Sequence, residues 1–368
     1  MRIAVIGCGG IGGTISACLT RAGLDVTPVT GSAAVVTALA RHGLRVRELD
    51  GATWTVQPAN PPRVSAADAD AGAPFDVLVM ATQNPALEGA LRSAVPRLAE
   101  GGVVVCCENG LPEERAAAIV GARRVVGCVV GWGATAVEPG FYQRTSRGTL
   151  QLGRLSPEAP DPAAGDRISI GSLAVLMGAA SESRVVDDLP AVRWSKLAIN
   201  CATSTIGACG GDALGTLLRH RFVRRLALEV FAEVADVAGA ESVRVAPVAG
   251  TFAIEKIAIS RAERLQRLGS PSLAYKHSLL LAVGMKYRRQ RSSMLYALER
   301  GRPPEIDFLN GEVVRRGERL GVPTPVNAAL VRAVRAIAAG RARSSLATLR
   351  AIHTAAVGGQ PGELAAVG

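Results

Sequence analysis

Lysine is scarce in this sequence, so the position of each lysine is informative. Lysine and arginine together number 42, yet only four are lysine: Lys196, Lys256, Lys276 and Lys286. Lys196 stands in "RWSKLAIN", residues 193–200, among mostly apolar neighbours. Because an ammonium group without a partner is costly to bury, we expect Lys196 to face either solvent or a functional site.

Aromatic residues are also few. They make up 4% of the chain, while the formal net charge is +11. A positively charged protein attracts anions, which include nucleic acids, phosphorylated cofactors and carboxylate substrates. The arginines are spread out and few aromatic rings are present, so we expect no nucleic-acid partner. A small anionic molecule is the expected partner.

Long apolar runs, signal sequences and metal-binding spacings are absent from the sequence. No run approaches the roughly 18 apolar residues that a membrane-spanning helix needs, and "MRIAVIG" leads into a glycine-rich turn without a cleavage pattern. The seven cysteines form no CxxC pair, and the four histidines form no metal-ligand spacing. We therefore expect a cytoplasmic protein with reduced thiols, no metal and no membrane association.

The N-terminus carries the pattern of a dinucleotide site. "MRIAVIG" predicts a buried parallel strand, "GCGGIG" supplies a G-x-G-x-x-G turn, and "GTISACLTRAG" predicts a helix that ends at Gly23. Such glycines allow a tight turn and a close approach of backbone to a pyrophosphate at the helix N-terminus. The alternative is a purely structural turn. The predicted cofactor-binding residues here are Gly7, Cys8, Gly9, Gly10, Ile11 and Gly12.

The second predicted strand, "DVTPVT", ends at Thr30-Gly31-Ser32 without an acidic residue. An NAD site usually has Asp or Glu there to bind the ribose hydroxyls. The missing acid favours NADP (NADPH) over NAD, and Thr30 is a predicted cofactor contact.

Two further strands are predicted within residues 75–84 and 101–110, and both end in polar residues. Ligands of open α/β sheets bind at these carboxyl ends. Gln83 and Asn109 are therefore candidate cofactor residues, although Asn109 could simply be a turn residue before Gly110. Residues 156–166 are predicted to form a loop.

Helical periods dominate after residue 186. We predict an α/β chain with a Rossmann-type domain at 1–185 and a mainly helical domain at 186–368, of which 356–368 form a tail. Helices are expected over 221–239 and 327–340, and a further helix is expected to open at Glu305 and Asp307. Lys196, Asn200 and Ser204, at i, i+4 and i+8, form one polar stripe.

These pieces together resemble the ketopantoate reductase (2-dehydropantoate 2-reductase) family. The resemblance covers nearly the whole chain and is carried by "GCGGIG", "ENG" at 108–110, "WSKLAIN" at 194–200 and "SSML…EIDFLNG…GVPTPVN" at 292–327. It implies reduction of a keto group with NADPH. It also implies that Lys196 is the general acid, with Asn200 and Glu305 beside it in catalysis. The substrate-binding residues that it implies are Asn109, Asn200, Ser204, Gln290, Ser293 and Glu305.

Bland alternatives exist for two of these residues. Glu305 could be an acid favoured in a first helical turn by the helix dipole, and Ser292 or Ser293 could be an N-cap. The chain also departs from the family's pattern. Gln83, Ser204, Gln290 and Gly31 stand where members often have a lysine, two asparagines and an arginine for the 2′-phosphate.

Three functions follow from these observations. The first is reduction of 2-dehydropantoate to pantoate. The second is reduction of a different 2-oxo acid, or of an imine, by the same fold. The third is a non-catalytic NADP-sensing protein, which the joint presence of Lys196, Asn200 and Glu305 disfavours. A homodimer is the assembly that we consider.

Overall fold

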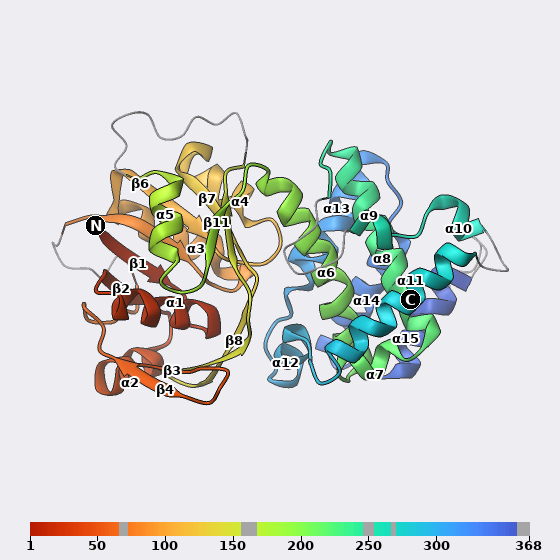
Figure 1. The fold of residues 1–368 in the computed structure, drawn as a ribbon, viewed down its shortest axis with the longest axis horizontal. Helices are drawn as coiled ribbons and strands as arrows, with labels where there is room; N and C mark the ends of the chain where they lie inside the picture. The colour runs from red at the N-terminus through yellow and green to blue at the C-terminus, as the bar shows by residue number, and fades with distance from the viewer. Residues whose placement is uncertain (66–72, 156–167, 246–253, 266–269, 359–368) are drawn as a thin grey trace. The chain divides into compact units, whose positions relative to one another are not determined.

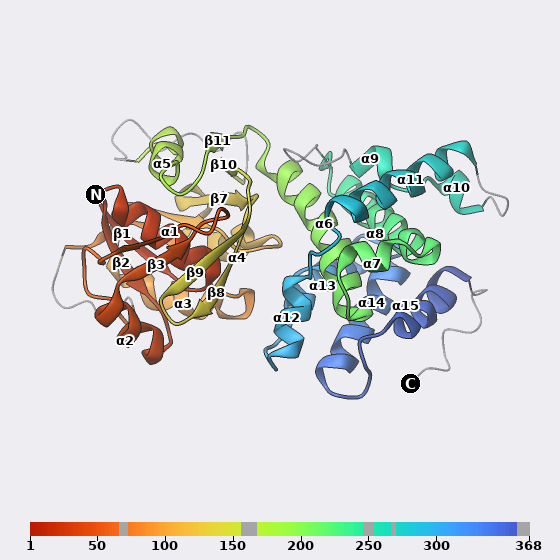
Figure 2. The same ribbon diagram turned by 60° about the horizontal axis from the view of Figure 1, so that its bottom comes forward.

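The chain forms two compact units, Met1–Pro190 and Ala191–Gly368, in a computed structural model. The structure describes all residues except 66–72, 156–167, 246–253, 266–269 and 359–368. The first unit is rich in strands and the second is helical (Figures 1 and 2). The predicted combination of a Rossmann-type domain and a helical domain is confirmed. The division after Pro190 lies close to the change predicted at residue 186.

A seven-stranded sheet forms the centre of the first unit. Its order is β11-β10-β7-β6-β5-β1-β2, and the strands from β7 to β2 pair in parallel. Their buried apolar runs are typical of parallel strands that are covered on both faces. The strands are β1 (Arg2–Ile6), β2 (Asp25–Val29), β5 (Phe75–Met80), β6 (Leu98–Cys106), β7 (Val125–Val130), β10 (Leu150–Gly153) and β11 (Ser183–Val185).

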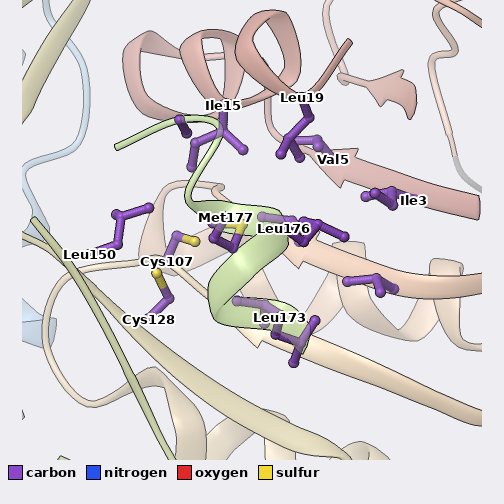
Figure 3. Close-up of a cluster of buried hydrophobic side chains, with 14 of the residues drawn as sticks. Ile3, Val5, Ile15, Leu19, Cys107, Cys128, Leu150, Leu173, Leu176 and Met177 are labelled. Carbon is purple, nitrogen blue, oxygen red and sulfur yellow. The ribbon is translucent and has the colours of Figure 1, made fainter. Parts of the chain in front are cut away.

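Helices cover both faces of this sheet. On one face, α1 (Gly10–Arg21) and α5 (Ile170–Met177) contribute Ile15, Leu19 and Met177 to a core with Ile3 and Val5 (Figure 3). The other face packs against α3 (Leu87–Ala94) and α4 (Pro112–Val120), which follow β5 and β6. The carboxyl ends of β1, β5 and β6 therefore come to one edge of the sheet, where ligands of this fold bind.

A second sheet of four strands covers the remaining side of α1. It has the order β4-β3-β9-β8, with β3 (Leu44–Arg47), β4 (Thr53–Val56), β8 (Gly133–Glu138) and β9 (Phe141–Ser146). A Cβ atom at Gly10 would lie 2.2 Å from the Ala134 oxygen, and one at Gly13 would lie 2.0 Å from the Tyr142 ring. Two small residues thus let α1 pack directly on β8 and β9. The helix α2 (Ala33–His42) adds Leu39 to the core beneath this sheet.

Ten α-helices, one 3₁₀ turn and one π-helical segment, counted among the described residues, form the second unit. The longest are α6 (Leu189–Gly210), which begins just before the division between units, and α8 (Arg221–Ala240). Both predicted helices are found, as α8 and as α14 (Pro325–Ala338). The others are α7 (Leu214–Leu218), α9 (Ile254–Ile257), α10 (Arg261–Leu265), α11 (Pro271–Lys286), α12 (Ser293–Glu299), α13 (Asn310–Leu320), α15 (Leu346–His353) and the π-helical η5 (Thr354–Gly358).

A buried polar network joins α8, α14, α13 and α6. The Glu233 carboxylate accepts hydrogen bonds from the backbone N–H groups of Val326 (2.8 Å) and Asn327 (2.9 Å), and so caps the start of α14. The Asn327 amide also donates to Glu233 (2.7 Å), and its oxygen accepts from Asn310 (2.9 Å). Asn310 in turn accepts from the Thr205 hydroxyl on α6 (2.6 Å). Since buried polar groups require partners, this network fixes how these helices pack.

One predicted helix start is wrong. No continuous helix opens at Glu305 and Asp307, because η4 (Glu305–Phe308) is a single 3₁₀ turn and α13 begins at Asn310. Leu309, with φ −112° and ψ −98°, leaves the helical region between them. Of the predicted tail at 356–368, residues 356–358 belong to η5 and the rest lie outside the described residues. The predicted loop at 156–166 lies outside them as well.

Candidate active site

The three glycines of the motif in the first unit have different surroundings. Gly7 has φ +102°, which favours glycine, and a Cβ there would lie 2.5 Å from the Ala81 oxygen. A Cβ at Gly12 would lie 1.9 Å from the Gly7 oxygen. At Gly9, by contrast, a Cβ would meet nothing within 4 Å. Gly7 and Gly12 are thus required by the fold, whereas Gly9 leaves open space at the N-terminus of α1.

This open space fits a dinucleotide pyrophosphate. The first N–H groups of α1 have no partners within the helix and carry its positive dipole end. A glycine without a neighbour at that end allows a phosphate to approach the backbone closely. The arrangement therefore suits the pyrophosphate that the sequence predicts for residues 7–12.

Cys8 and Ile11 support the turn from inside the protein. The Cys8 thiol is buried and lies 3.5 Å from the Val29 oxygen, to which it donates. Burial raises the pKa of Cys8 to about 12, so the residue remains a neutral thiol. Ile11 is partly buried and packs against the core of the large sheet. Their side chains face the core, so a contact with the cofactor would come through their backbone.

The end of β2 holds Thr30 in a local turn. Its N–H donates to the Arg63 oxygen (2.9 Å), and its hydroxyl accepts from the Ser32 N–H (3.4 Å). A Cβ at Gly31 would meet nothing within 4 Å. Thr30 is buried, so its role as a direct cofactor contact stays a prediction.

Hydrogen bonds join the two loops that follow β5 and β6. The Thr82 N–H and hydroxyl both donate to the Glu108 carboxylate, at 3.0 and 2.9 Å. The buried Asn84 amide donates to the Asn109 oxygen (3.0 Å). Gln83, between Thr82 and Asn84, is exposed. The predicted residues Gln83 and Asn109 thus lie on loops that are held together, at the strand ends where the sequence places them.

Arg115 on α4 braces this pair of loops, and the sequence reasoning missed it. Its guanidinium donates to the Asn84 backbone oxygen (3.0 Å), to the Asn84 side-chain oxygen and to Glu88 (3.1 Å). No local pattern marks Arg115, because its partners come from the preceding crossover. An ordinary helix arginine would look the same in the sequence.

In the second unit, one face of α6 is polar and only partly buried. Lys196, Asn200 and Ser204 are half-buried, while most other residues of the helix are buried. The Asn200 amide nitrogen is buried, yet it has no hydrogen-bond partner within the described residues. Because an unpaired buried donor is costly, this nitrogen is suited to a group that is not part of the chain. The stripe is half-buried as a whole, and its place in a functional site stays a prediction.

The same face of α6 contacts the start of α12. A Cβ at Gly207 would lie 2.8 Å from the Ser292 hydroxyl oxygen. Ser292 caps α12 by accepting from the Leu295 N–H (3.1 Å), as the alternative for this pair of serines predicted. Ser293 is the first residue of α12 and is exposed. Gln290, also exposed, accepts at its backbone oxygen from the Leu214 N–H (2.9 Å).

The Glu305 segment is attached to α6 from another direction. Asn310 receives the Thr205 hydroxyl and donates to the Cys201 oxygen (3.2 Å), next to Asn200. The turn η4, which carries the half-buried Glu305, leads directly into this anchor. Helix α6 is therefore contacted by the start of α12 at Gly207 and by Asn310, which follows η4, at Cys201 and Thr205. A shared role of these segments in one site stays a prediction.

Neither a metal cluster nor a membrane-spanning helix occurs in the part of the chain that the structure describes. No group of three His, Cys, Asp or Glu side chains there could hold a metal ion. None of its helices combines the length and the apolar character that crossing a membrane demands. All seven cysteines lie among the described residues; they are buried, and none of them forms a disulfide bond there.

Comparison with known families matches most of the chain. Residues 3–157 match the family model "Ketopantoate reductase PanE/ApbA", and residues 188–338 match "Ketopantoate reductase PanE/ApbA C terminal". The 2-dehydropantoate 2-reductase of Mesorhizobium japonicum is 27% identical over 362 residues, covering 93% of this chain and 99% of that protein. The enzyme of the same name from Pyrococcus horikoshii is 24% identical, covering 92% and 99%.

Solved structures show the same fold. A PanE/ApbA family ketopantoate reductase from Ralstonia eutropha JMP134 superposes with a TM-score of 0.73 at 24% identity, covering 93% of this chain and 99% of that chain. A D-mandelate dehydrogenase with NADH and anilino(oxo)acetate reaches 0.75 at 20% identity, with the same coverage. One family model matches the Rossmann-type unit and the other matches the helical unit, and both describe the same family. The chain belongs to the ketopantoate reductase family and is an oxidoreductase that acts on a C=O group.

Proposed function

We propose that this protein is an NADPH-dependent 2-dehydropantoate 2-reductase that uses Lys196 as its general acid. The observation that carries the proposal is the half-buried stripe on α6, where Lys196 stands one turn from an Asn200 amide nitrogen that has no hydrogen-bond partner within the described residues. An ammonium and a vacant amide donor on one helix face suit a substrate with a keto oxygen and a carboxylate.

The residues of the first unit hold the cofactor in this proposal. The backbone of Gly7–Gly12 receives the pyrophosphate at the start of α1, where Gly9 leaves space for it. The loops that carry Gln83 and Asn109 flank the cofactor, braced by Arg115 through Asn84. When bound, NADPH supplies the hydride for the carbonyl carbon.

The residues of the second unit act on the substrate. As the carbonyl oxygen gains negative charge, the Lys196 ammonium stabilises that charge and donates the proton that completes the alcohol. Asn200 donates a hydrogen bond that orients the substrate. Ser293 binds the carboxylate, and Glu305 supplies a negative charge that favours the ammonium form of Lys196. Ser204 and Gln290 line the substrate side.

A panel of 2-oxo acids tests the proposal. We expect NADPH oxidation to be fastest with 2-dehydropantoate, compared by kcat/KM with pyruvate, 2-oxoisovalerate and phenylglyoxylate. A clear preference for an aromatic 2-oxo acid would instead assign the protein to the mandelate type of reaction. NADPH that binds but is oxidised with no member of the panel would contradict the proposed activity. A homodimer and a cytoplasmic location remain predictions.

A further inference from the structure

A short segment, residues 60–63, runs along the outer edge of β2. The Asn60 amide donates to Asp25 (2.5 Å) and to the Val26 oxygen (3.3 Å). Further along, the Arg63 N–H donates to the Pro28 oxygen, and the Arg63 oxygen accepts from the Thr30 N–H, both at 2.9 Å. Since β2 is an edge strand of the large sheet, this segment pairs with the edge and places Arg63 opposite Val29.

The sequence of the segment explains why only its last residue forms a sheet bridge. Pro61 and Pro62 have no N–H groups, and their rings fix an extended backbone. They therefore cannot extend the pairing, while Arg63 offers the first available N–H. The position of Arg63 beside the end of β2 is thus set by its backbone and by two stiff residues before it, and does not depend on its side chain.

The end of β2 is where a Rossmann-type site distinguishes its two cofactors. An acid there binds the ribose hydroxyls of NAD, and a nearby arginine accommodates the 2′-phosphate of NADP. This chain has Thr30, Gly31 and Ser32 there, and a Cβ at Gly31 would meet nothing within 4 Å. The local sequence supplies neither charge. The residue that the backbone hydrogen bonds bring to this corner is Arg63.

We propose that Arg63 binds the 2′-phosphate of NADPH and sets the preference of this protein for NADPH over NADH. The inference rests on the proposed function and names the residue responsible for its cofactor choice. A guanidinium suits the task because its planar fork donates two parallel hydrogen bonds to a phosphate and it stays charged at every physiological pH. The half-buried side chain keeps part of its surface accessible to such a ligand.

Fluorescence titration of the full chain with NADPH and NADH tests this assignment. We expect Arg63→Ala to weaken NADPH binding by about 10–100-fold, since a hydrogen bond to a charged group contributes roughly 1.5–3 kcal/mol. The Kd for NADH should change by less than about twofold, because NADH lacks the 2′-phosphate. In competition experiments, Arg63→Ala should weaken binding of 2′,5′-ADP, which carries the 2′-phosphate, and should leave binding of 5′-AMP nearly unchanged.

Three controls keep the outcomes distinct. Arg92→Ala, in the last turn of α3, removes an exposed positive charge elsewhere in the unit and should leave both Kd values unchanged. Gly31→Asp should lower NADPH affinity, because it adds a carboxylate at the end of β2 that repels the 2′-phosphate. Arg63→Gln, with an unchanged melting temperature, serves if the alanine variant unfolds.

The results separate this inference from the proposed function. A wild-type protein that prefers NADPH, with a preference that survives Arg63→Ala and Arg63→Gln, would overturn the role of Arg63 alone. A wild-type protein that prefers NADH would overturn the proposed cofactor together with this inference. An equal loss of NADPH and NADH affinity in Arg63→Ala would assign the residue to edge structure and would also overturn the inference.

Discussion

The cofactor residues predicted in the first unit and the substrate residues predicted in the second unit differ in what shapes them. In the first unit, six consecutive residues, Gly7–Gly12, form the predicted phosphate turn, and its geometry depends on atoms that are missing: no Cβ at Gly7 or Gly12. In the second unit, the predicted site would depend on side chains from three separated segments, around Lys196, Ser292 and Glu305. The contacts between these segments and α6 are the close approach of Ser292 to Gly207 and the hydrogen bonds of Asn310. Gly7 and Gly12 leave no room for an added Cβ atom. The side chains of the second unit depend instead on the contacts that position their segments.

Removing the ammonium should have the largest effect. We expect Lys196→Ala to lower kcat by about 10²–10⁴-fold, the usual loss for a missing general acid. Binding of NADPH should be nearly unchanged, because the cofactor is assigned to the first unit. Steady-state kinetics and fluorescence titration on the same preparation measure both quantities.

Lys196→Arg is the matched control for charge, and it should recover little activity because a guanidinium scarcely releases a proton. A purely structural lysine predicts a different pattern. In that case the alanine variant would melt earlier while its folded fraction kept a normal kcat, and the proposed mechanism would be wrong.

The stability that the polar network around Glu233 gives to the second unit should depend on pH. Burial raises the pKa of Glu233 from 4.5 to about 7, although three N–H groups and the Arg264 charge oppose the shift. Between these two values the unfolded chain has released the proton that the folded chain retains, so stability falls as pH rises from about 4.5 to 7. The total loss is about 3 kcal/mol, at 1.36 kcal/mol for each pKa unit.

Urea unfolding at several pH values in this range measures that slope. Glu233→Gln cannot titrate, so its share of the pH dependence should disappear, even though the variant is less stable overall because its amide meets other donors. Parallel pH profiles for the two proteins would show that Glu233 does not change its protonation on unfolding.

An added methyl group should affect two glycines of the first unit differently: Gly12, which the fold requires, and Gly9, which is proposed to face the cofactor. Gly12→Ala forces a contact of 1.9 Å with the Gly7 oxygen, so we expect a loss of about 1–3 kcal/mol in stability, typical of overpacking. Gly9→Ala meets no neighbour, so its melting temperature should stay near the wild-type value while NADPH affinity falls. Equal melting temperatures and equal Kd values for the two variants would remove the distinction between them.

The smallest predicted effect lies at the contact between α6 and α12. Ser292→Ala removes the N-cap of α12 and should cost about 1 kcal/mol of stability. The substitution also leaves space between Gly207 and the start of α12, next to Ser293, which is proposed to bind the carboxylate. We therefore expect KM for the 2-oxo acid to rise more than kcat falls. Ser292→Thr restores the cap and should recover the stability; thermal unfolding and substrate titration of both variants check this.

The sequence predicted the parts of the molecule whose causes are local. The strand, glycine turn and helix at residues 2–21 follow one another directly, and the α6 stripe repeats with the helical period. Pairings over long separations were not predicted. Arg45 pairs with Phe141, and Arg63 pairs with Val29, through contacts that no periodicity reveals.

The one misplaced helix start has the same origin. Acidic residues at Glu305 and Asp307 favour a helical first turn, and the local signal was sound for η4. Long-range hydrogen bonds from Asn310 to Thr205 and Cys201 then hold the true start of α13 five residues further on, at Asn310. Tertiary contacts outweighed a correct local preference.

The placement of α1 between two sheets has a consequence for the order in which the protein is made. The glycine turn is synthesised well before the surfaces that receive Gly10 and Gly13, which lie at Ala134 and Tyr142. A nascent chain that stops short of β9 lacks the surface that receives Gly13 of this helix. Helix α1 must therefore wait for more than a hundred later residues before its packing surface is complete.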